Sequence, residues 1–94
     1  MIEHIKISPI EYLEVFRVIQ HLARNRNVSM LETWWSLQRD IQAAWDRAWT
    51  TGNLSAQWNW QTLFPADRCP TVSEFIVTIA REMTAGHNPP NLLE

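Results

Sequence analysis

The residue types that most often do chemistry in proteins are few and scattered in this sequence. His4, His21 and His87 lie far apart, and none has a second histidine or a cysteine at metal-ligand spacing. The only cysteine, Cys69, follows Arg68 and precedes a predicted helix, and both neighbours are features that lower a thiol pKa. A slightly activated thiol is therefore one interpretation, but we favour an incidental cysteine. The pattern predicts no metal site, no cofactor and no catalytic residue.

Three basic side chains form the one cluster that could bind an anion. Arg17, His21 and Arg24 follow an i, i+4, i+7 spacing, which places them on one face of a helix. Glu11 and Glu14 share this face, and a Glu14–Arg17 pair is typical of a solvated helix surface. We favour a solvated polar stripe, and an anion-binding site is the alternative.

Tryptophan is over-represented, with six in 94 residues. Trp35 lies on the flank of its predicted helix, and Trp58 and Trp60 cannot point the same way on a helix because one residue separates them. Exposed tryptophans are common at the centres of protein interfaces. We therefore assign partner binding to Trp35, Trp58 and Trp60, and we expect Trp35 and one of the other two to be exposed. The remaining three are expected to face the core: Trp34, Trp45 and Trp49.

The helices that would position these residues are marked by a repeated start signal. Ser or Thr is followed three residues later by Glu at three places, Ser8, Ser29 and Thr71, and each place precedes an apolar-periodic segment. These capping boxes predict helices over 9–24, 30–50 and 72–85. The expected fold class is all-α, a small bundle of three main helices plus a short helical or irregular segment at 54–64.

Segment 54–64 is ambiguous. Ser55 could cap a short helix there, whereas Ala56, Trp58 and Trp60 also alternate with polar residues as a strand would. We favour a helix, and the alternative is an α+β fold in which 56–62 pairs with 2–7. We expect one domain over 1–94, with an extended N-terminus at 1–8 and a C-terminal tail at 87–94 that docks through Leu92 and Leu93.

The predicted helix at 9–24 has an unusually wide apolar face that covers roughly 220° of its circumference. We expect this helix to lie centrally and to pack against 30–50 and 72–85 together, and the alternative is that one flank meets a second subunit. The predicted core takes the centres of three helical arcs: Phe16, Ile19, Leu22, Trp34, Ile41, Trp45, Phe75, Ile76, Ile79 and Met83.

Composition narrows the function classes. The formal charge of −2 at pH 7 and the pI of 5.9 argue against nucleic acid and anionic membranes as partners. The sequence has no long apolar run, so we expect a cytoplasmic protein. Residues 22–29 resemble the turn of a helix-turn-helix motif, but the helix after it carries Glu32, Trp34 and Trp35 in place of base-reading side chains. DNA binding is therefore a lesser alternative.

These observations favour a non-enzymatic protein-interaction module. We expect a small bacterial or mobile-element protein of regulatory, adaptor or inhibitor type, whose partner is another protein or a second copy of the chain. The rival hypothesis is a helical protein or enzyme that binds a small ligand in a Trp-lined pocket, with an arginine as anchor.

Overall fold

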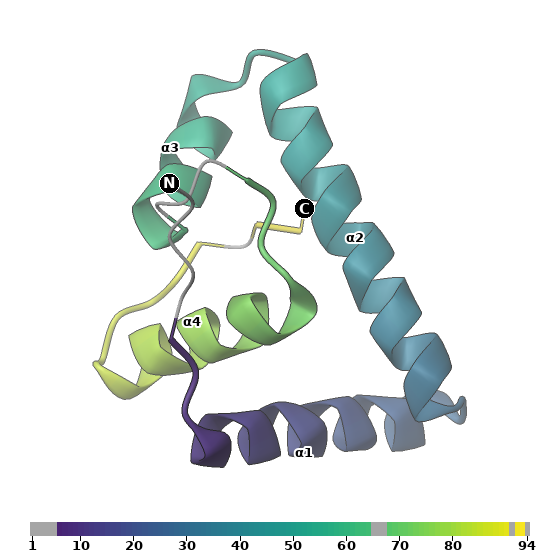
Figure 1. Cartoon of the computed structure of the whole chain (residues 1–94). Coiled ribbons are helices and arrows are strands. Elements are labelled where there is room, and N and C mark those ends of the chain that lie inside the picture. Colours follow the sequence, from purple (N-terminus) through teal and green to yellow (C-terminus); the bar gives the residue numbers. More distant parts are fainter. Residues whose placement is uncertain (1–5, 65–67, 91, 94) are drawn as a thin grey trace.

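The fold is all-helical over the part of the chain that the structure describes. The computed structural model describes residues 6–64, 68–90 and 92–93, and none of these residues lies in a strand. Four helices follow one another, as Figure 1 shows: α1 (Pro9–Arg26), α2 (Met30–Thr50), α3 (Leu54–Leu63) and α4 (Val72–Thr84). This arrangement confirms the all-α prediction.

Local side-chain caps explain where the helices begin. Ser8 and Thr71 form complete capping boxes with Glu11 and Glu74, in which each hydroxyl accepts the glutamate backbone N–H and each carboxylate accepts the cap backbone N–H. At the start of α2 the structure shows the hydroxyl half of the capping box. Ser29 Oγ accepts the backbone N–H of Glu32 at 3.1 Å. All three predicted helix starts are therefore confirmed.

Segment 54–64 forms a helix, but Ser55 is not its cap. The carboxamide oxygen of Asn53 accepts the backbone N–H of Ala56 at 3.1 Å, so the helix begins two residues earlier than a Ser55 cap would allow. The alternative strand pairing fails because 56–62 is helical. Its proposed partner, 2–7, lies mostly outside the described residues, and Lys6 and Ile7 are not in a strand.

The centre of the core is a cluster of aromatic rings from α2, α3 and α4. Trp60 of α3 is 1% exposed, and its ring meets Trp45 edge to face with centroids 5.7 Å apart. Phe64 and Phe75 stack on each other at 5.7 Å and both contact Trp60. Trp45 also stacks on Trp49 at 4.1 Å. These contacts bring three helices together at one end of the molecule.

Helix α1 contributes less to this core than its sequence predicts. It contacts both α2 and α4, as expected, but it lies at the edge of the molecule (Figure 1). Only Val15, Ile19 and Ala23 are buried, one narrow stripe along its length. The predicted central position of α1 is therefore wrong, and much of its wide apolar face is left exposed.

Two residues of the predicted core are exposed, which corrects that prediction. Phe16 is 54% exposed. The aromatic core lies between α2, α3 and α4, and the Phe16 side of α1 does not face it. Met83 is exposed because it lies near the C-terminal end of α4, beyond the buried turns that contain Val77 and Thr78. Ile19 and Ile41 are fully buried, as predicted, and the others are partly buried: Leu22, Trp34, Trp45, Phe75, Ile76 and Ile79.

The C-terminal tail folds back onto the helices. Leu92 is buried in the core cluster, and Leu93 packs against that cluster. In Figure 1 the tail leaves the end of α4 and runs between α4 and α3 toward α2. The docking predicted for these two leucines is therefore confirmed.

The Trp58 and Trp60 pair tests how the core is organised. Truncating the buried ring in Trp60→Ala removes contacts to three other aromatic residues and should lower the free energy of unfolding by about 3–5 kcal/mol. Trp58 is 70% exposed, so Trp58→Ala should change it by less than about 0.5 kcal/mol. Urea unfolding followed by circular dichroism measures both, and equal losses would contradict the assigned faces of α3.

Candidate functional site

The three basic groups of the predicted anion cluster lie on the exposed face of α1. Arg17 and His21 are exposed on α1, and each bonds along its own helix: Arg17 to Glu14 at 3.5 Å, His21 to Asn25 at 3.1 Å. Arg24 is also exposed. The predicted Glu14–Arg17 pair is thus confirmed, and the three basic groups lie along a solvated stripe.

The other chemical candidates are equally dispersed. Among the described residues, no three His, Cys, Asp or Glu side chains gather closely enough to hold a metal ion. His4 lies outside the described residues, and His87 contacts Glu82 at 2.7 Å. Within the same part of the chain, no helix has both the length and the apolar character needed to cross a bilayer.

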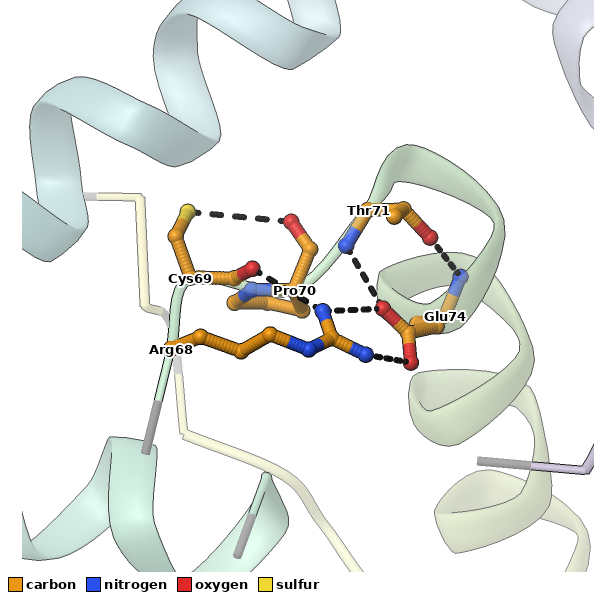
Figure 2. Close-up of polar contacts among 5 residues, drawn as sticks. All are labelled: Arg68, Cys69, Pro70, Thr71 and Glu74. Carbon is orange, nitrogen blue, oxygen red and sulfur yellow. Dashed lines mark hydrogen bonds and ion pairs between the residues drawn. The ribbon is translucent and has the colours of Figure 1, made fainter. Parts of the chain in front are cut away.

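Cys69 is not an activated thiol. Burial, with Asp46 as a second cause, raises the pKa of Cys69 to about 11, which contradicts the alternative of a slightly activated thiol and agrees with the favoured incidental cysteine. Its Sγ lies 3.6 Å from the carbonyl oxygen of Pro70 (Figure 2). The neighbouring guanidinium of Arg68 opposes this rise only weakly because it points toward Glu74 instead of toward the sulfur.

Arg68 and Glu74 form a clasp at the start of α4. The two guanidinium nitrogens donate to the two carboxylate oxygens at 2.8 and 2.7 Å, while the same carboxylate accepts the backbone N–H of Thr71 (Figure 2). The paired carboxylate raises the pKa of Arg68. Because Glu74 is buried, this clasp keeps its charge hydrogen-bonded and holds the preceding loop against the helix.

A second clasp holds α1 against α4. Arg81 donates to both carboxylate oxygens of Glu11 at 2.7 and 2.8 Å, and also to the carbonyl oxygen of Lys6 at 2.6 Å. Hydrogen bonds from Arg81, followed by that from the Ser8 backbone, lower the pKa of Glu11 to about 2. Glu11 and Arg81 both line a groove of about 560 Å³ between α1 and α4. Their charged groups are hydrogen-bonded to each other.

The strongest candidate surface lies where α1 and α2 meet. Tyr12 and Phe16 of α1 face Leu31 and Trp34 of α2 across an apolar groove of about 510 Å³. Leu13 adjoins Phe16 on α1 at i, i+3 spacing, and Trp35 adjoins Leu31 on α2 at i, i+4. We call this surface the corner patch, and it consists of six residues: Tyr12, Leu13, Phe16, Leu31, Trp34 and Trp35.

The structure separates the three tryptophans that the sequence assigns to partner binding. Trp35 is 56% exposed and belongs to the corner patch, whereas Trp60 is buried and offers no area to a partner. Trp58 is exposed on α3, where the neighbouring Gln57 side chain donates to the carbonyl oxygen of Ala48. Ala48 lies 13 residues after Trp35, roughly 20 Å along α2. The two exposed tryptophans therefore do not form one patch.

Aromatic rings of α2 and α3 fill the space between these two helices. Trp45 and Trp60, the rings that a pocket between α2 and α3 would use, pack directly against each other. Comparison with protein-family models, curated proteins and solved structures finds no match to this chain.

Most of the corner patch was missed by sequence reasoning. The flank position of Trp35 on α2 predicts its exposure, but Phe16 is predicted to lie in the core, and Leu31 is not singled out. The excess width of the apolar face of α1 indicates that part of this face stays exposed, because one narrow contact cannot cover it. The sequence did not indicate which flank would remain open.

The Glu11–Arg81 clasp predicts a pH-dependent stability difference. The pKa of Glu11 is lowered, so its contribution is fully present above about pH 4.5 and is lost as the pH falls toward 2. Glu11→Gln should therefore melt below the wild type at pH 6, and the gap should close between pH 4.5 and 2. Differential scanning calorimetry measures this difference in melting temperature at each pH. Glu14→Gln, at the exposed pair with Arg17, is the matched control; a gap independent of pH for Glu11→Gln would contradict the clasp.

The raised pKa of Cys69 predicts slow alkylation. With a pKa near 11 in place of the ordinary 9, the thiolate fraction at pH 8 is about 100-fold lower than in the unfolded chain. Iodoacetamide labelling followed by mass spectrometry should be correspondingly slow and should accelerate up to pH 11. The same chain in guanidinium chloride is the control, and equal rates in the two states would show that burial does not protect the thiol.

Proposed function

We propose that this chain is a non-enzymatic protein-interaction module that binds through the corner patch. The observation that carries the proposal is the grouping of large apolar side chains at one exposed corner. Tyr12, Phe16 and Leu31 are each more than half exposed around a groove whose other wall is Trp34. Soluble proteins seldom leave such a patch uncovered unless it binds something.

The chemistry of the patch favours a protein as its occupant. Apart from Ser73, the side chains that line the groove are aromatic or aliphatic, which is typical of the apolar centre of a protein interface. Trp and Tyr offer large contact area at low side-chain entropy cost, and they are frequent anchors in such interfaces. The occupant fits this groove if it presents an apolar ridge, such as one face of an amphipathic helix.

The remaining function classes receive less support. The basic groups of α1 are solvated, Cys69 has a raised pKa, and the two arginine clasps are closed by carboxylates. None of these groups converges on the corner groove. A regulatory, adaptor or inhibitor role is consistent with a small domain whose distinctive surface is one apolar corner.

Site-specific crosslinking tests the proposal. A photoreactive p-benzoylphenylalanine replaces Leu31 in the corner patch or, as the control, Asp40 on another exposed face of α2. In cells of the native source, irradiation should give a discrete protein adduct at position 31 and none at position 40. The captured protein, once purified, should bind Phe16→Ser at least tenfold more weakly than wild type. Absence of an adduct at position 31, or the same adducts at both positions, would refute the proposal.

A further inference from the structure

We infer that the occupant of the corner patch is a second copy of this chain, placed against the first by a two-fold axis. The inference rests on the proposed function and specifies the partner of the same surface. Three properties of the patch support it: its area, its shape and the charges at its rim.

The exposed area suits a small homodimer. Five patch residues are at least half exposed, which amounts to on the order of 600–700 Å² and exceeds the largest patch of many soluble monomers, about 300–600 Å². Complete burial of the patch against its own copy would remove at most roughly 1,300 Å² from solvent. Stable specific interfaces begin at about 1,200 Å². The corner patch alone therefore supplies the area that such a dimer needs.

The patch carries both a groove and a ridge, as a self-complementary surface requires. The groove of about 510 Å³ is lined by Phe16, Leu31 and Trp34, and Trp35, one turn after Leu31 on α2, lies outside this lining and is 56% exposed. A two-fold axis makes each surface meet the same surface, so a ridge residue of one copy can enter the groove of the other and the reverse. Trp35 is the natural ridge residue because it is large, rigid and exposed.

The charges around the patch also allow the face to meet itself. Arg17 adjoins Leu13 on α1 at i, i+4 spacing, and Glu32 and Arg39 adjoin Trp35 on α2 at i, i+3 and i, i+4 spacing, so the exposed rim carries both signs of charge. A surface with a single sign of charge would repel its own copy. Here a two-fold axis can place each acid near a base, and the formal charge of −2 per chain adds little repulsion.

Sedimentation velocity on the purified full chain tests the inference over about 1–200 µM. The wild type should convert from monomer to dimer within this range. Trp35→Gln should raise the dissociation constant at least tenfold, whereas Trp58→Gln, an exposed tryptophan on α3, should leave it within about twofold. At a concentration low enough for the wild type to be monomeric, far-ultraviolet circular dichroism should show unchanged helix content and melting for both variants, because neither ring is buried within one chain.

Several results would overturn the second copy as occupant. These are a wild type that stays monomeric, an assembly that grows beyond the dimer, or equal weakening by Trp35→Gln and Trp58→Gln. A monomeric pure chain that still gives a position 31 adduct with a different protein overturns this inference and leaves the proposed function standing. A monomer without any such adduct overturns both. In the pure protein, the adduct at position 31 should map to residues 12–16 or 30–35 of the second copy.

Discussion

The packing around Trp60 is the constraint on which the rest of this structure depends. Its ring contacts Trp45 of α2 and Phe75 of α4, and also Phe64, the residue that follows the last turn of α3. A domain of this length can fill only one modest core, and large rings fill much of it. The core therefore forms where α2, α3 and α4 converge, and the buried Leu92 of the tail joins the same cluster.

Helix α1 is left to attach at the edge of that core. One buried stripe, of which Ile19 is the centre, packs against the other helices, and the Arg81 fork on Glu11 fixes its N-terminal end against α4. A single stripe cannot cover an apolar face as wide as that of α1. Tyr12 and Phe16 consequently remain exposed on the flank that faces α2, and the corner patch follows directly from where the aromatic residues gather.

The sequence predicted the features that neighbouring residues determine. It did not predict which side chains are buried where that depends on how helices far apart in the sequence pack. Helix starts depend on side chains three residues away, so Ser8, Ser29 and Thr71 located them correctly. Periodicity likewise showed that one of Trp58 and Trp60 must point outward. It could not show which one, nor that Phe16 would be exposed, because both outcomes depend on how the helices pack around one limited core. The Arg81 fork joins residues 70 positions apart, and no local pattern reveals it.

One tryptophan, Trp34, belongs both to the packing that stabilises the fold and to the proposed interface. Trp45 and Trp60 stabilise the core, whereas Trp35 is exposed and can be replaced without loss of packing. Trp34 is partly buried: it packs against the core, lines the corner groove, and also lines a hollow of about 290 Å³ beside Cys69. An occupant of the groove therefore meets a ring that the core already holds in place. Such a ring loses little side-chain entropy on binding, which is what makes a preorganised anchor effective.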